Sequence, residues 1–154
     1  MTTIALALLI GVVAGLRTLT APAAISWAAS LGWLDLSGTW LALFGHPWAP
    51  WILTALALAE LFNDKLPSTP SRTVPTQFGA RILTGALSGA AIGASAGALA
   101  AGLLAGVVGA VIGTLGGRAV RARLAATFKR DLPAALIEDA IAVVSAWLIV
   151  VSRS

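Results

Sequence analysis

Cysteine is absent from this chain of 154 residues, and histidine occurs once, at His46. Without cysteine there can be no disulfide, no thiol nucleophile and no thiolate metal site. A single imidazole does not make a histidine-based metal centre, so we expect no metal and no cofactor. The sequence also offers no Ser-His or Cys-His pair for nucleophilic catalysis, and we therefore expect no enzyme.

Charge is scarce as well: charged residues make up 10% of the chain, and hydrophobic residues make up 58%. A soluble domain carries roughly a quarter of charged residues. The chain therefore lacks the polar surface that faces water, and we predict an all-α integral membrane helix bundle. The net charge of +4 does not indicate a nucleic-acid partner, because the basic residues lie in short loops between apolar runs. Such loops set topology and contact lipid headgroups.

The first 24 residues resemble a cleavable signal sequence only superficially. No lysine or arginine precedes the apolar run, and Arg17 lies inside it. A secretory signal has the reverse arrangement, so we interpret this stretch as a retained first span.

Five apolar stretches predict about five transmembrane helices in one domain. They cover about residues 3–21, 48–62, 79–97, 102–123 and 133–151. A tryptophan-rich stretch follows the first of them, and we expect it to lie along one face of the bilayer or to dip into it, since tryptophan favours the interface. A sixth span, formed by residues 23–46, is the alternative and would move the N-terminus outside.

The positive residues test this count. Lys65 and Arg72 follow the second predicted span, and five basic residues between 118 and 130 follow the fourth. Both groups lie on one side of the membrane if residues 79–125 cross it twice. The positive-inside rule then places them in the cytoplasm, with the N-terminus inside and the C-terminus outside.

Glycines recur every four residues through the third and fourth predicted spans, at Gly85, Gly89, Gly93 and Gly97 and again at Gly109, Gly113 and Gly117. Small residues at this spacing form a flat helix face that a neighbouring backbone can approach closely. We predict glycine-zipper packing between these two spans. The same faces would also suit sliding in a transport cycle or a homo-oligomer seam, and the glycines do not decide between these uses.

Ionisable residues inside the spans are the functional candidates, because a charge at mid-bilayer costs at least about 2.5 kcal/mol. The candidates for substrate binding or proton coupling are Arg17, Glu60, Asn63, Asp64, Arg81, Arg118, Glu138 and Asp139. One interpretation is an ion-pair network that fixes helix register. The other is a polar cavity in which Glu60 or Glu138 exchanges protons or binds a cationic or polar solute.

Arg17 stands apart from the other candidates, because it follows a long apolar run in the first span. The predicted topology places it nearer the outer face. There it would pair with Asp35, bind an anionic group or extend to the outer headgroups.

The most distinctive string runs from Glu60 to Pro75 and reads E-L-F-N-D-K-L-P-S-T-P-S-R-T-V-P. Together with Gly15-Leu16-Arg17 and the glycine-rich second half, it resembles an uncharacterised family of small bacterial inner-membrane proteins with a domain of unknown function. The resemblance implies a multi-pass protein of the bacterial inner membrane and no particular activity.

The prolines of this string predict a stiff, non-helical loop over residues 65–77. The loop would hold Lys65, Ser71, Arg72 and Thr73 in place, and these residues are candidates for contact with an anion or a lipid headgroup. Alternatively, its cations pair with Glu60 and Asp64 and set topology.

We expect a small membrane transporter or channel for a small polar or charged solute, coupled to protons through buried carboxylates. Five spans would need a homodimer to enclose a path, and membrane lipids are the expected surroundings. The alternative is a structural or lipid-binding membrane protein whose buried charges serve only helix assembly.

Overall fold

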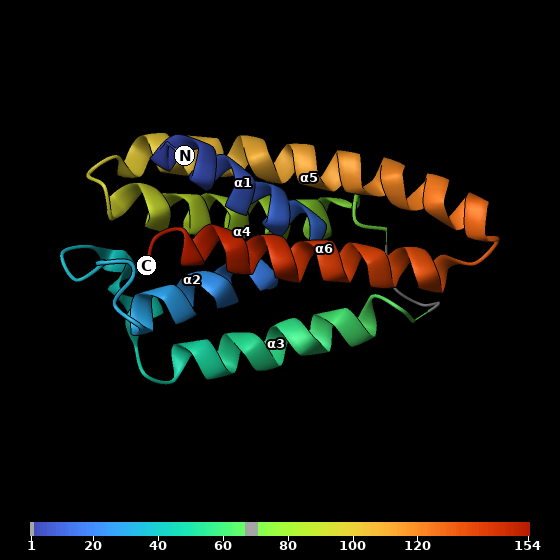
Figure 1. The fold of residues 1–154 in the computed structure, drawn as a ribbon. Coiled ribbons are helices and arrows are strands. Elements are labelled where there is room, and N and C mark those ends of the chain that lie inside the picture. Colours follow the sequence, from blue (N-terminus) through green and yellow to red (C-terminus); the bar gives the residue numbers. More distant parts are fainter. Residues whose placement is uncertain (1, 67–70) are drawn as a thin grey trace.

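The computed structural model describes residues 2–66 and 71–154, and the regular structure of these residues is helical (Figure 1). In chain order the elements are α1 (Thr3–Leu16), α2 (Thr20–Ser30), a short 3-10 helix η1 (Trp40–Gly45), α3 (Ala49–Asn63), α4 (Pro75–Ala94), α5 (Leu99–Phe128) and α6 (Asp131–Val151). The predicted all-α class is confirmed. Two helices, α5 and α6, are long and apolar enough to cross a membrane.

The first predicted span is not one helix, because the chain leaves helical structure after Leu16 and starts α2 at Thr20. Pro22 explains the break: in a continuous helix its ring would meet the carbonyl of Thr18, whereas a proline is tolerated in the first turn of a new helix. The prediction of an unbroken span over residues 3–21 is therefore wrong.

Helices α1 and α2 form an antiparallel hairpin whose tip is residues 17–19. Helix α1 runs parallel to α5, with Gly11 against Gly106 and Gly15 against Ala110. Helix α2 runs antiparallel to α3, which points the same way as α5 (Figure 1). At 1.5 Å per residue the two hairpin helices are only about 21 and 16 Å long, against a hydrocarbon core of about 30 Å. The hairpin thus turns back inside the bundle.

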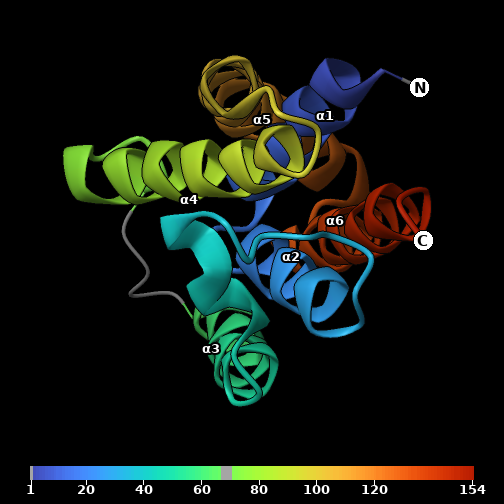
Figure 2. The ribbon, with the colours of Figure 1, turned by 90° about the vertical axis from the view of Figure 1, so that its left-hand side faces the viewer.

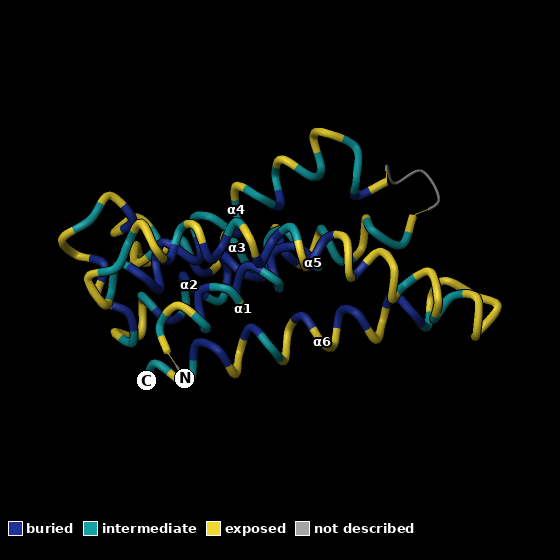
Figure 3. The backbone as a smooth tube through the Cα atoms, turned by 90° about the horizontal axis from the view of Figure 1, so that it is seen from above, coloured by how far each residue is buried: buried dark blue, intermediate teal, exposed yellow. Residues whose placement is uncertain are grey.

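This hairpin brings both ends of the chain to the same end of the bundle (Figures 1 and 3). The turn between α5 and α6 and the start of α4 lie at the opposite end, which we call the basic end because Arg123, Lys129 and Arg130 lie there. The predicted five-span arrangement instead has the two termini at opposite ends, and the difference comes from the turn at residues 17–19.

Helices α1, α4 and α5 pack with their backbones close together, side by side in Figure 2. A Cβ built on Gly89 would overlap the Gly102 carbonyl, and one built on Gly11 would overlap the Gly106 carbonyl. Glycine is needed at these crossings because backbone meets backbone, which is how helices gain packing energy in lipid. Larger apolar side chains, among them Ile10, Ile25 and Ile92, fill the rest of the core.

Helix α3 is peripheral and packs chiefly on α2 and η1 (Figure 2). Within the helix, only Pro50 and Ala57 are buried. Large apolar side chains on its outer face, such as Trp51, Leu58 and Phe62, are exposed. The loop that follows was predicted to be non-helical through residue 77, but α4 already begins at Pro75. Residues 67–70 of that predicted loop lie outside the described residues.

Candidate functional site

The tip of the α1–α2 hairpin is capped by charged side chains from two other helices. On the carbonyl side, Nη1 of Arg81 in α4 donates to the carbonyl oxygens of Gly15 and Leu16, at 2.9 and 2.8 Å. These are carbonyls that the end of α1 leaves without helical partners. A guanidinium at the carboxyl end of a helix also opposes the negative end of the helix dipole.

On the amide side of the same tip, the carboxylate of Glu60 in α3 accepts from two successive backbone N–H groups. The Thr18 amide donates to Oε1 at 2.7 Å, and the Leu19 amide donates to Oε2 at 2.8 Å. Helix α2 has no side-chain cap of its own. Glu60 therefore supplies from another helix the acceptors and the negative charge that the start of α2 requires.

Arg17 lies at the tip with its side chain fully buried. Its guanidinium pairs closely with Asp64, at the end of α3, and with Asp139 of α6, and it lies 3.7 Å from Oε2 of Glu138. The expected partner Asp35 lies in a different part of the fold, on the exposed connector before η1. The prediction that Arg17 lies near the face away from the basic loops is wrong, since the tip reaches Glu138, about 10 Å along α6 from the basic end.

Glu138 makes the second strong contact of the site. Its carboxylate accepts from both terminal nitrogens of Arg72, at 2.5 and 3.0 Å, and this fork is buried. Arg121 of α5 approaches the same carboxylate at 3.4 Å and also donates to Asp64 at 2.6 Å and to Asp131. Bidentate pairs of this kind fix both distance and orientation, so these contacts hold α5, α6 and the start of α4 in register.

The charges of this region balance. We call the set the charged cluster; it contains the carboxylates of Glu60, Asp64, Asp131, Glu138 and Asp139 and the cations of Arg17, Lys65, Arg72, Arg81 and Arg121. Five negative groups face five positive groups, which lowers the cost of placing them among apolar helices.

A pocket of about 500 Å³ opens between α3 and α4 and reaches the tip. Its polar lining consists of Thr18, Glu60, Asn63, Asp64, Gln77, Arg81 and Thr84, and its apolar lining of Leu19, Leu56, Ala59, Ala80 and Leu83. We call it the lateral pocket. Leu56 and Leu83 are exposed, so the pocket opens sideways on the bundle between apolar side chains.

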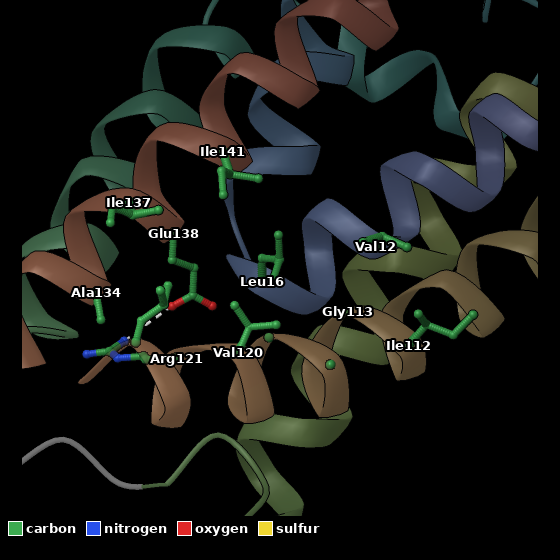
Figure 4. A pocket seen from close by; sticks show the side chains of 13 residues that line it. Val12, Leu16, Ile112, Gly113, Val120, Arg121, Ala134, Ile137, Glu138 and Ile141 are labelled. Atoms are coloured by element: carbon green, nitrogen blue, oxygen red, sulfur yellow. Dashed lines mark hydrogen bonds and ion pairs between the residues drawn. The ribbon is translucent and has the colours of Figure 1, made fainter. Parts of the chain in front are cut away.

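A second, apolar pocket of about 270 Å³ lies across the cluster, between α1, α5 and α6. Figure 4 shows Glu138 projecting from α6 into it toward Arg121, with Leu16 and Val120 beside the carboxylate. The lateral pocket reaches Glu60, Asp64 and Arg81, whereas the apolar pocket reaches Glu138 and Arg121. The charged cluster thus separates two pockets.

The structure gathers most of the residues singled out in the sequence, with two groups of exceptions. Arg118 is exposed and, within the described residues, donates to Thr73 at 3.5 Å. Ser71 and Thr73 hydrogen-bond to each other at 3.0 Å. Lys65, expected with Arg72 to face an anion, pairs instead with Asp139 at 2.7 Å, and Arg72 pairs with Glu138.

Two charged residues of the cluster, Arg121 and Asp131, were not among the predicted candidates. In the sequence, Arg121 is one of several cations that set topology. It lies four residues after Gly117, on the same helix face as Gly113, and that spacing on the packed face could have indicated an inward direction. The backbone carbonyls and amides of residues 15–19 also belong to the site. Their role could not be predicted from residue types, because it depends on the break between α1 and α2.

The fold and this site define a class: an all-helical membrane protein with a buried, balanced charged cluster at the tip of a helical hairpin. The chain belongs to the family described as a domain of unknown function (DUF4126), whose model matches residues 4–152. No curated protein matches the chain. No solved structure matches it either.

Proposed function

We propose that the protein is a small membrane transporter or channel for a small polar or charged solute, with the lateral pocket as its binding site. The observation that carries this proposal is the reach of that pocket from the side of the bundle to Glu60, Asp64 and Arg81. Charged groups inside an apolar bundle are costly, and those that line an open space commonly mark the pathway of a substrate or ion.

The hairpin supports the same proposal. Transporters commonly form their substrate sites where helices are interrupted inside the membrane, because the free helix ends offer polar backbone groups to a solute. In this chain the interruption at residues 17–19 lies beside the lateral pocket, and Glu60 in the pocket wall is the candidate to carry a proton. A homodimer would place a second copy against the open side.

We also propose a multi-pass arrangement in the bacterial inner membrane with the basic end in the cytoplasm, following the positive-inside rule. Both termini then lie outside the cytoplasm. The alternative topology with a sixth span over residues 23–46 also has the N-terminus outside. Because the chain has no cysteine, single cysteines can report the topology without background. We expect an impermeant maleimide added to intact cells to label Ser154→Cys and to leave Arg130→Cys unlabelled. The reverse pattern would overturn the orientation.

A structural or lipid-binding role is the second candidate, and the balance of the charged cluster favours it. The fork of Arg72 on Glu138 and the pair of Lys65 with Asp139 have no charge left over for a solute. On this view the charges fix only which helices assemble. The two candidates differ in what they require of Glu60.

Flux through reconstituted liposomes tests the proposal. Protons are followed with an enclosed pH dye under an imposed potential, and a panel of small cations, anions and neutral polar solutes is followed by uptake. We expect flux above that of empty liposomes in the wild type and a loss of about tenfold or more in Glu60→Gln, as for removal of a positioned proton-transfer group.

Asp35→Asn is the matched control, because it also neutralises a carboxylate but at an exposed position far from the cluster. It should leave the flux unchanged. Wild-type liposomes no leakier than empty ones, or equal flux in the wild type and Glu60→Gln, would favour the structural role instead.

A further inference from the structure

Glu60 occupies the place where an external anion would bind. Both of its carboxylate oxygens accept from the Thr18 and Leu19 amides, at the start of a helix of 11 residues that lacks its own cap. Successive amides at a helix start form an anion site, because they combine free donors with the positive end of the helix dipole. Here the bound anion is the protein's own side chain.

A second observation, on α4, points to a ligand at the same place. Arg81 is 2% exposed and lines the lateral pocket, and its Nε has no hydrogen-bond partner in the described part of the chain. Another nitrogen of the same guanidinium, Nη2, lies 4.0 Å from Oε1 of Glu60. The guanidinium thus retains donor capacity beside the capped amides, and its planar fork matches the oxygens of a phosphate.

We propose that the hairpin tip is a binding site for a phosphate group, and that Glu60 fills this site when no ligand is bound. The ligand's oxygens would accept from the Thr18 and Leu19 amides and from Arg81. This inference rests on the proposed function and names the substrate class of the same pocket.

The charges around the tip support exchange of one anion for another. Three ionisable groups line the lateral pocket: Glu60, Asp64 and Arg81. Asp64 is held by Arg17 and Arg121, so Glu60 is the carboxylate available for displacement. A phosphate that displaces Glu60 keeps a negative charge at the start of α2 and beside Arg81, and neither group is left uncompensated among apolar helices.

The geometry also permits displacement. Glu60 belongs to α3, the peripheral helix, and the pocket lies between α3 and α4. A change of rotamer of the Glu60 side chain would withdraw the carboxylate from the amides while Asp64 stays bound to Arg17 and Arg121. Since exposed Leu56 and Leu83 line the opening, the phosphate can arrive free from water or on a lipid headgroup.

The test is binding of radiolabelled inorganic phosphate to the purified full-length protein in detergent, measured by equilibrium dialysis. In Glu60→Gln the side chain would offer the two amides one neutral acceptor instead of two charged oxygens. We therefore expect this variant to bind phosphate about tenfold more tightly than the wild type, because the internal competitor is weakened. Asp35→Asn should bind like the wild type. Phosphate binding that is unchanged or weaker in Glu60→Gln would overturn the proposal.

Arg81 supplies the opposite result. Arg81→Lys keeps the positive charge but loses the fork, and we expect it to weaken phosphate binding by about tenfold, with little change in thermal unfolding. Combined with Glu60→Gln, it should cancel the gain. Full binding by a folded Arg81→Lys protein would remove Arg81 from the site and overturn the proposal.

Two arms separate the sources of the phosphate. Competition by short-chain phosphatidic acid but not by short-chain phosphatidylcholine supports a headgroup ligand, whereas binding of inorganic phosphate unaffected by either lipid supports a free one. Absence of binding and competition in both arms overturns the inference. Phosphate binding without any flux would overturn the proposed function alone, and flux of protons or cations without phosphate binding would overturn this inference alone.

Discussion

Replacing Arg17 by glutamine should destabilise the fold more than most single changes. The Arg17 guanidinium is fully buried and is in contact with Asp64 and Asp139, with Glu138 at 3.7 Å. In Arg17→Gln these carboxylates would keep their burial and lose their common counter-charge. Removing one partner of a buried ion pair costs about 3–5 kcal/mol, because an uncompensated charge is left behind.

The expected shift follows from this magnitude. A chain of this size loses roughly 2–4 °C of Tm per kcal/mol, so the change should lower Tm by about 6–20 °C. Thermal unfolding of the detergent-solubilised protein, followed by circular dichroism, measures it. Arg118→Gln is the matched control, since Arg118 is exposed and is seen in the described part of the chain to make a long hydrogen bond, at 3.5 Å, to Thr73. Its Tm should stay within about 2 °C of the wild type, as for an exposed charge.

A further variant separates charge from shape. Adding Asp139→Asn to Arg17→Gln removes one of the uncompensated charges, so the double variant should recover part of the lost Tm. A Tm for Arg17→Gln within about 2 °C of the wild type, the range of an exposed charge, would refute the view that electrostatic pairing holds the hairpin tip in place. So would a double variant less stable than Arg17→Gln.

Three further predictions use other parts of the structure. Gly89→Leu should lower Tm by an amount equivalent to at least about 1–3 kcal/mol, because the leucine side chain would meet the Gly102 backbone. Gly79→Leu is the control and should be tolerated, because the space beside Gly79 is open; thermal unfolding compares the two variants. Ser37→Ala should raise the pKa of Asp35, measured by NMR titration, because the Ser37 hydroxyl and amide donate to that carboxylate and lower its pKa. A lowered pKa stabilises the folded state at pH values above the ordinary pKa of the carboxyl, and this contribution is lost as the pH falls. Glu138→Ala should cost about 3–5 kcal/mol, again measured by thermal unfolding, because the buried Arg72 guanidinium would keep only its longer contact with Asp64, at 3.8 Å.

The sequence predicts the helical class well because composition and long apolar runs determine it. Helices α5 and α6 could be placed from hydropathy alone. The hairpin could not, because residues 3–30 form a nearly continuous apolar stretch whose turn contains no glycine. The signals for the break were Pro22 and Arg17 itself, and each is also compatible with a span that ends nearby. The missed turn explains why the structure has both termini at one end of the bundle (Figures 1 and 3).

The candidate residues were found because few charges occur in an apolar chain, so each one is conspicuous. Their pairing was a different matter. Glu60 and Asp64 share a helix face, and this spacing predicted two acids acting together. In the structure they divide: Asp64 binds Arg17 and Arg121, whereas Glu60 binds backbone amides. Spacing along a helix gives the face of a side chain but not the partner that another helix brings to it.

The division between Glu60 and its neighbours bears on the choice between transport and assembly. A purely structural cluster should resemble the fork of Arg72 on Glu138, in which charged groups meet at short range and are buried. Glu60 and Arg81 instead cap the same helix break from opposite sides and stand 4.0 Å apart at the wall of an open pocket. Closing that gap would gain Coulomb energy but would pull Glu60 from the Thr18 and Leu19 amides or Arg81 from the Gly15 and Leu16 carbonyls. A ligand at the tip would have to replace Glu60 on the Thr18 and Leu19 amides, whereas a structural cap needs Glu60 to stay there, which is why Glu60→Gln distinguishes transport from assembly most directly.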